Sequence, residues 1–351
     1  MELDVPERQQ VVEPARRFPT RVILAALVAM VVAAAAAAGL ALTRGGGTTP
    51  IGSGVVVIET NLAYQGGAAA GTGMVLTPSG EILTNNHVIR GATDIKVRVP
   101  STGQSYAAQV VGYDVTDDVA VLQASGAGGL KTVSLGSSSS VHSGQSVLAL
   151  GNAGGTGHLT RAPGTVITTG RSITVSDDQG GSENLSGLIE TNAAVRPGDS
   201  GGPLLNSDGQ VIGMDTAASV SNDVAQTTSN QGYAIPIDKA LSIAEQIHSG
   251  NGSDTIHVGG TAFLGVEASS DSYAGSGAVV SAVVPGSAAE SAGITAGDLI
   301  TSIGGQTVSS PDTLSQVVVA QKPGDSIDVV FVDQGGATQT TSITLASGPP
   351  R

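Results

Sequence analysis

The stretch RPGDSGGPL at residues 196–204 presents one serine, Ser200, between glycines and then continues into an apolar strand. Glycines permit positive φ angles and close backbone approach, so they can raise the Ser200 hydroxyl and turn neighbouring amides toward one point. Such a turn suits a nucleophile beside an oxyanion site. The alternative is an ordinary hairpin turn, because Gly and Ser dominate these turns as well.

Two other stretches carry side chains that a serine nucleophile needs. The stretch TNNHV at 84–88 closes a predicted strand with His87, and an imidazole titrates close enough to neutral pH to act as a general base. Asp117 and Asp118 precede the apolar run 119–122, where a carboxylate can orient a histidine. Alone, a histidine at the end of a strand more often has a structural role, and the acidic pair is equally compatible with a solvated turn. Together the stretches follow the order His, Asp, Ser, which is the chain order of chymotrypsin.

Composition predicts a mainly β protein. The 351 residues include 50 Gly but only 3 Phe, 5 Tyr and no Trp, so the cores must consist of Val, Ile, Leu and Ala. No cysteine is present, which excludes disulfides and Cys-ligated metals. The formal net charge of −14 argues against a nucleic-acid partner, because phosphate binding requires clustered cations.

Short apolar runs separated by Gly, Pro, Ser and Asp clusters predict two β-barrels, at about 55–128 and 130–236. The spacing of apolar residues in 238–248 predicts a helix with Asp238 as its N-cap, which ends a first domain at 55–248. Residues 249–260 are predicted to be a linker, and residues 261–346 a small separate domain with strands and two helices.

An apolar segment near the N-terminus has the length of a membrane span. Residues 22–42 contain no charge and would extend about 31 Å as a helix. Arg16, Arg17 and Arg21 lie directly before the segment and Arg44 alone directly after it, which predicts a cytoplasmic tail at 1–21 and an external remainder. Residues 43–54 would then be a flexible linker. A cleaved signal peptide is the alternative interpretation of the same segment.

The whole pattern resembles the HtrA/Deg branch of the chymotrypsin-like serine proteases over about residues 52–346. The stretches that carry the resemblance are AGTGMVL at 70–76, TNNHVI at 84–89, DDVAVLQ at 117–123, LALGN at 148–152, IETNAAVRPGDSGGPL at 189–204 and GYAIPIDKA at 232–240. This implies a double β-barrel protease domain, a following α+β PDZ domain and one preceding transmembrane helix. The sequence departs from the family's frequent pattern at Asp199, where Asn is common, and at Asn192, where Asp is common.

The resemblance implies a role for each residue of the proposed site. Ser200 would be the nucleophile, His87 the general base and Asp118, rather than Asp117, the orienting carboxylate. The turn Gly198-Asp199-Ser200 would supply the oxyanion hole through its amides.

Two segments of the chain are predicted to form the substrate pocket. Residues 193–196 and 214–216 would line it, and the resemblance implies small aliphatic P1 residues. Asp215 leaves a basic P1 residue as the alternative.

Further residues would connect the protease to a regulatory domain. Arg171 matches a loop arginine that senses PDZ ligands in the family, although a solvated loop charge is the competing interpretation. The stretch GSAAESAGITAGDLITSIGG at 286–305 resembles a PDZ domain. Its loop Phe263, Leu264, Gly265 and Val266 would bind the terminal carboxylate of a peptide through backbone amides.

The resulting expectation is a membrane-tethered, ATP-independent endopeptidase that cuts unfolded or damaged extracytoplasmic proteins and is regulated by C-terminal peptides at the PDZ groove. No cofactor and no metal site are expected, since the remaining histidines lack ligand spacing. The resemblance also implies a homo-oligomer, usually a trimer. The alternative from another class is a chaperone or peptide-binding adaptor whose protease domain is normally quiescent.

Overall fold

The computed structural model describes residues 50–176, 182–216, 231–269 and 276–351. The predicted tail at 1–21, the predicted transmembrane helix at 22–42 and most of the linker at 43–54 lie outside these ranges. Within the described ranges, no helix has the length and apolarity that a membrane span requires. Residues Ile51–Arg351 group together as one unit.

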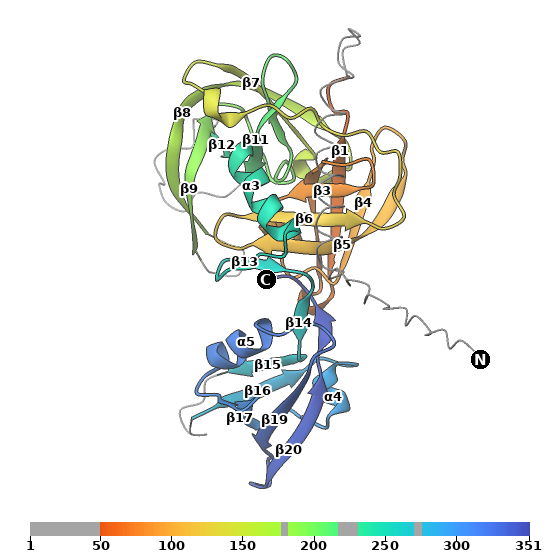
Figure 1. Ribbon diagram of the computed structural model, residues 1–351, viewed down its shortest axis with the longest axis vertical. Helices are drawn as coiled ribbons and strands as arrows, with labels where there is room; N and C mark the ends of the chain where they lie inside the picture. Colours follow the sequence, from red (N-terminus) through yellow and green to blue (C-terminus); the bar gives the residue numbers. More distant parts are fainter. Residues whose placement is uncertain (1–49, 177–181, 217–230, 270–275) are drawn as a thin grey trace, which may run out of the picture. The chain divides into compact units, whose positions relative to one another are not determined.

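The first barrel closes from six antiparallel strands in the ring order β1-β2-β3-β6-β5-β4 (Figure 1). In its first strand, the sequence VVVI at 55–58 is apolar at every position rather than at alternate ones. Val56 and Ile58 belong to the core inside the barrel, whereas Val55 belongs to a core on the other face, so both faces are buried. The strands are β1 (Val55–Leu62), β2 (Gly67–Val75), β3 (Glu81–Thr84), β4 (Asp94–Arg98), β5 (Ser105–Asp114) and β6 (Val119–Ala124).

The second barrel is also closed, in the order β10-β11-β12-β9-β8-β7. Its strands are β7 (Ser146–Gly151), β8 (Thr160–Ser176), β9 (Ser182–Thr191), β10 (Pro203–Leu205), β11 (Val211–Thr216) and β12 (Gly232–Pro236). Short 3-10 helices stand in the loops of the two barrels: η1 (Ala63–Gln65), η2 (Ser138–Ser140) and η3 (Ala153–Gly155). The predicted pair of barrels is therefore present.

Helix α3 (Ile237–His248) joins the barrels through one shared core. Its residues Ile243 and Ile247 pack with Leu83 of the first barrel and Met214 of the second. Gly112 on β5 allows this close approach, because a Cβ there would lie 2.6 Å from Ile247 Cγ2. The predicted helix is confirmed.

The predicted N-cap of α3 is wrong. Pro236 occupies the N-cap position, and Asp238 lies in the first turn. The Asp238 carboxylate instead accepts hydrogen bonds from the Ser137 hydroxyl at 2.9 Å and from the amides of Ser138 and Ser139 at 3.0 and 3.1 Å. This carboxylate holds the η2 loop against the start of α3.

The predicted linker at 249–260 contains a strand. β13 (Ile256–Val258) adds to the edge of the first sheet by pairing with β5, Ile256 opposite Asp114. Ile256 is buried in the shared core, which supplies the physical reason for the pairing. Its signal in the sequence is two apolar residues, Ile256 and Val258, on either side of His257, which is too short a pattern for a strand prediction.

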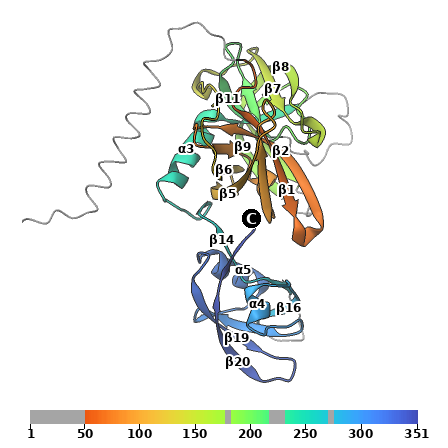
Figure 2. The same ribbon diagram turned by 90° about the vertical axis from the view of Figure 1, so that its right-hand side faces the viewer.

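The predicted second domain has its own core under a sheet of order β15-β16-β17-β19-β20, with β18 paired to β17. β19 and β20 form the long hairpin seen in Figure 2. A separate two-stranded sheet joins β14 to β21. The elements are β14 (Thr261–Phe263), β15 (Val266–Ser269), β16 (Ala278–Val283), α4 (Ala288–Ser291), β17 (Leu299–Ile303), β18 (Gln306–Thr307), α5 (Pro311–Val319), β19 (Ser326–Val332), β20 (Thr338–Thr344) and β21 (Ala346–Gly348).

Candidate active site

His87 stands on a single helical turn between two strands of the first barrel. The sequence predicts that His87 closes a strand, but β3 ends at Thr84 and α2 (Asn86–Ile89) follows. Val88 and Ile89 are buried, so the apolar half of this turn anchors it in the barrel core while the His87 ring remains 30% exposed. The backbone of His87 is therefore fixed in the barrel, whereas its imidazole ring is open to solvent.

Asp118 contacts His87 through both carboxylate oxygens. Oδ2 lies 2.8 Å from His87 Nδ1, and Oδ1 accepts from the His87 amide at 2.9 Å. Because a carboxylate only accepts, the proton of a neutral imidazole resides on Nδ1, which leaves Nε2 as the acceptor. The structure thus brings together two of the predicted residues.

The backbone at Asp118 is strained. Its φ of 53° makes it the sole non-glycine residue with positive φ among the described residues. Such a conformation costs about 1–3 kcal/mol and persists only where surrounding contacts fix it. Asn85 supplies one of them by donating from Nδ2 to the Asp118 carbonyl at 2.9 Å. Asp118 is 2% exposed, so this strain places its carboxylate under the histidine and away from water.

Thr216 is a contributor that sequence reasoning missed. Its hydroxyl donates to Asp118 Oδ2 at 3.3 Å across the interface of the two barrels. The sequence places 214–216 in the substrate pocket, and this prediction is corrected, since Met214, Asp215 and Thr216 are each at most 1% exposed. They support the site from below, and Asp215 offers no open contact for a basic P1 side chain.

We expect Thr216→Val to lower kcat about tenfold, because it removes one hydrogen bond to a charged, buried carboxylate while keeping the side-chain shape. The control is Thr160→Val, whose hydroxyl donates to the Gly151 carbonyl in the same barrel and does not touch Asp118. Steady-state kinetics and thermal unfolding should be measured on both. An unchanged kcat for Thr216→Val would contradict the assignment.

The turn that carries Ser200 is held by contacts that only glycine tolerates. Gly198 and Gly201 have φ of 96° and 82°, and a Cβ would overlap the Asn152 carbonyl at the first and the Thr72 carbonyl at the second. Thr72 donates its amide to the Ser200 carbonyl at 2.8 Å and its hydroxyl to the Gly198 carbonyl at 2.7 Å. The first barrel therefore fixes a turn that belongs to the second.

Ser200 and the histidine turn meet at Gly71 on β2. A Cβ at Gly71 would lie 2.6 Å from Val88 Cγ1 and 3.3 Å from the Ser200 carbonyl. The backbone of Ser200 and the helix that carries His87 therefore approach the same point. The Ser200 backbone therefore lies close to the turn that carries His87.

The amides of the Ser200 turn differ in their hydrogen bonding. The Asp199 amide donates to the Arg196 carbonyl at 2.9 Å, so it is already used within the turn. The Gly198 amide donates to no acceptor within the described part of the chain. Of the amides predicted for the oxyanion hole, Gly198 is therefore available and Asp199 is not.

Two carboxylates lie buried beneath this turn. Asp215 is completely buried, and burial together with the charge of Asp199 raises its pKa well above the usual value. Burial also raises the pKa of Asp199, although the Arg196 amide, which donates to it at 3.0 Å, opposes the shift. Both Asp215 oxygens and Asp199 Oδ1 lack a partner among the described residues. Protonation of Asp215 would relieve its repulsion with Asp199.

We expect Asp215→Asn to remove a pH-dependent loss of stability. Because the pKa of Asp215 is raised in the folded state, its contribution is most favourable at acidic pH and declines as pH rises above the usual value for aspartate. The variant should therefore gain on the wild type toward pH 8, by about 1–3 kcal/mol in free energy of unfolding. Urea titrations at several pH values measure this difference.

The matched control for that measurement is Asp208→Asn, an exposed carboxylate in the turn between β10 and β11. Its curve should stay within about 0.5 kcal/mol of the wild type. Parallel curves for wild type and Asp215→Asn would contradict the buried charge.

Arg171 lies in strand β8 rather than in a loop. It pairs with Leu188 on β9, and its Nε lies 3.4 Å from Glu190 Oε2. Tyr233 lies next to this ion pair: burial and the Glu190 charge raise its pKa, while Arg171 opposes the shift. The guanidinium is thus anchored at a half-exposed position on the second barrel.

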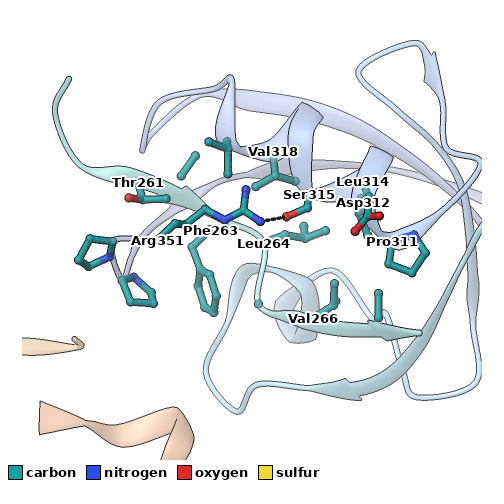
Figure 3. Close-up of a pocket in the computed structure, with 16 residues that line it drawn as sticks. Thr261, Phe263, Leu264, Val266, Pro311, Asp312, Leu314, Ser315, Val318 and Arg351 are labelled. Atoms are coloured by element: carbon teal, nitrogen blue, oxygen red, sulfur yellow. Dashed lines mark hydrogen bonds between the residues drawn. The ribbon is translucent and has the colours of Figure 1, made fainter. Parts of the chain in front are cut away.

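The predicted PDZ loop has the backbone for anion binding. Gly265 has φ of 88°, and the amides of Leu264 and Gly265 donate to no acceptor in the part of the chain that is described. Leu264, Val266 and the α5 residues Leu314 and Val318 line a groove of about 350 Å³ (Figure 3). No group of three His, Asp or Glu side chains suited to a metal occurs within the described ranges.

Comparison with known proteins agrees with this geometry. Residues 71–214 match the trypsin-like peptidase domain family, and residues 279–332 match the PDZ domain family. Protease Do-like 1, chloroplastic, of Arabidopsis thaliana is 32% identical over 316 residues, which cover 84% of this chain and 70% of that protein. Serine protease PepD of Mycobacterium tuberculosis is 36% identical over 305 residues, covering 83% of this chain and 63% of that protein.

Other relatives are matched over a smaller fraction of their own length. Serine protease Do-like HtrA of Bacillus subtilis is 31% identical over 276 residues, which cover 75% of this chain and 60% of that protein. The chain therefore spans about six-tenths of the length of several curated relatives. Among solved structures, the HtrA-type protease AlgW with tripeptide is 28% identical, with 85% of this chain and 94% of that one covered and a TM-score of 0.48.

The chain matches the trypsin-like and PDZ family models, and the Arabidopsis relative, 32% identical, is matched over seven-tenths of its length. The chain belongs to the HtrA (Do-like) family of serine proteases, with a trypsin-like domain followed by one PDZ domain.

Proposed function

We propose that this protein is an ATP-independent serine endopeptidase. The observation that carries the proposal is the contact of 2.8 Å between His87 Nδ1 and Asp118 Oδ2 beside the glycine turn of Ser200. This contact fixes the imidazole tautomer whose Nε2 can take a proton from a serine hydroxyl.

In the proposed reaction, Ser200 Oγ attacks the scissile carbonyl while His87 Nε2 takes its proton. The amides of Gly198 and Ser200 stabilise the negative oxygen of the tetrahedral intermediate. His87 then returns the proton to the leaving amine, and an acyl-enzyme remains on Ser200. A water molecule then attacks the acyl-enzyme while His87 takes its proton, and the acid product leaves as the Ser200 hydroxyl is restored. Asp118 stays ionised and stabilises the imidazolium in both halves.

The substrate class follows from the family and the pocket that remains. We propose unfolded or damaged polypeptides as substrates, cut after small aliphatic P1 residues beside segment 193–196. Burial of Asp215 removes the main argument for a basic P1 residue. Cleavage-site mapping on a disordered protein tests activity and specificity together. We expect cuts after Val, Ala or Ile, and predominant cuts after Lys or Arg would contradict the pocket.

Regulation through the PDZ domain forms a further part of the proposal. Among the described residues the amides of Leu264 and Gly265 donate to no acceptor, which supports binding of a C-terminal carboxylate, with Phe263 and Val266 flanking it. Arg171 is proposed to connect ligand binding to the order of the Ser200 turn, supported by its anchoring to Glu190. Arg171→Ala should weaken stimulation by peptide and leave peptide affinity unchanged.

The location and assembly rest on sequence and relatives. We propose that residues 22–42 tether the protease domain outside the cytoplasmic membrane. A relative from Marinomonas is described as a probable periplasmic serine endoprotease. We also propose a homo-oligomer, with a trimer as the expected state, and sedimentation velocity measures this directly.

A chaperone or peptide-binding adaptor is the second candidate function. The groove beside α5 favours it, since this groove can bind peptides whether or not Ser200 is reactive. The variant Ser200→Ala distinguishes the two candidate functions. An adaptor would protect unfolded proteins from aggregation equally well with this variant, whereas the endopeptidase would lose its activity.

A further inference from the structure

The PDZ groove is lined partly by the chain's own residues 349–351. Pro349, Pro350 and Arg351 border the same space as the Leu264–Val266 loop and the groove-facing side of α5. Figure 3 shows the Arg351 side chain reaching across the groove toward α5. A peptide that enters this groove therefore meets residues 349–351.

Pairing of β21 with β14 directs these residues to the groove. Gly348 lies opposite Thr261, at the start of β14, and the next two residues are prolines. Proline lacks an amide hydrogen and has a fixed φ, so Pro349 and Pro350 cannot extend the two-stranded sheet. They form a stiff connection from β21 to Arg351, which lowers the entropy lost when Arg351 is held in place.

Arg351 is held on the PDZ side by α5. Its Nη2 donates to the Ser315 hydroxyl at 2.6 Å. Ser315 is one helical turn from Pro311 and lines the groove next to Leu314. The hydrogen bond is exposed, so its net free energy is modest and the contact can open.

The backbone of the same segment is held by the turn that carries His87. Asn86 Nδ2 donates to the Arg351 backbone oxygen at 2.8 Å, and the Gly91 amide donates to the Pro350 carbonyl at 2.8 Å. Asn86 is 2% exposed and belongs to α2, directly before His87. The segment therefore contacts the groove through the Arg351 side chain and the α2 turn through its backbone.

We propose that residues 349–351 are a built-in occupant of the PDZ groove, which an incoming peptide must displace, and that displacement releases α2. The inference rests on the proposed peptide binding by the PDZ domain. It adds a specific competitor and a physical connection to His87. The apparent affinity for peptide is then reduced by the fraction of molecules in which the groove is closed.

The test measures peptide binding in the full chain with Ser200→Ala, so that no peptide is cleaved. The probe is a fluorescent decapeptide that ends in valine with a free carboxylate, and the readout is anisotropy. Deletion of 349–351 should lower the Kd about three- to tenfold, and Arg351→Ala should lower it in the same direction. Arg351→Lys keeps the charge and should lie closer to the wild type.

Lys322→Ala provides the matched control, since it removes an exposed cation of the same domain that does not line the groove. Its Kd should equal that of the parent. Equal Kd values for the parent, the deletion and Arg351→Ala would overturn the proposal. No binding by any of them would overturn it as well, together with the proposed PDZ regulation. The endopeptidase proposal would remain, because it is tested through Ser200 alone.

Hydrogen exchange tests the connection to α2 without reference to activity. Saturating peptide should accelerate exchange at the Gly91 amide, which loses the Pro350 carbonyl as its acceptor. Deletion of 349–351 should give the same increase in the absence of peptide. Unchanged exchange at 86–91 on peptide binding would show that α2 is not released and would overturn this part.

Discussion

Replacing Ser200 with alanine should lower kcat for cleavage of a disordered polypeptide by about six orders of magnitude. The estimate follows the loss in subtilisin when its serine nucleophile is removed. The physical reason is that no acyl-enzyme can form, so only binding and the oxyanion amides remain to accelerate hydrolysis. Quantitative electrophoresis or mass spectrometry of the products measures the rate.

Ser207→Ala is the matched control for this experiment. Ser207 is exposed in the turn after β10, a few residues beyond Ser200, and should retain full activity. Thermal unfolding of both variants excludes a loss of fold as the cause. If Ser200→Ala kept more than a hundredth of the wild-type rate, the nucleophile would have to be another residue.

Asp118→Asn should lower kcat about ten-thousandfold near neutral pH. The same change in the chymotrypsin fold has this effect because it stabilises the wrong imidazole tautomer. Here the carboxylate accepts from His87 at two positions and from Thr216 at 3.3 Å. An amide cannot accept at both oxygen positions, so the proton on His87 would shift to Nε2 and block proton transfer from Ser200.

Asp117→Asn tests which of the two adjacent aspartates orients His87. Asp117 pairs with Lys239 at 2.6 Å, and both side chains are about 30% exposed. An ion pair of this kind contributes only up to about 1 kcal/mol. Its loss should leave kcat within about twofold. A large loss in Asp117→Asn with a small one in Asp118→Asn would reverse the assignment of the orienting carboxylate.

The sequence carries strong information on the fold and on the predicted triad residues. Continuous apolar runs and Gly-rich turns predict two β-barrels because each run must bury its faces. The glycines at 198 and 201 also mark the Ser200 turn in the sequence, because a Cβ at either position would overlap neighbouring backbone. These features depend on local pattern, which a sequence displays directly.

Features that depend on contacts between distant segments were missed or misplaced. Thr216 supports Asp118 from a strand 98 residues later, and no local pattern marks its hydroxyl. Asp215 suggested a basic P1 pocket until the packing around it proved complete. The connection between Arg351 and Asn86 joins segments 265 residues apart. Burial and long-range hydrogen bonds of this kind are determined by tertiary packing, which overrides local propensity.

The proposed endopeptidase activity requires a reactive hydroxyl at Ser200 that is activated by His87, and covalent labelling tests this most directly. The full chain is incubated with a fluorophosphonate, with and without a C-terminal peptide, and the modified residue is located by mass spectrometry. We predict one adduct, on Ser200, that is absent from Ser200→Ala and strongly reduced in His87→Ala. An adduct on a different residue, or no adduct with or without peptide, would contradict the account.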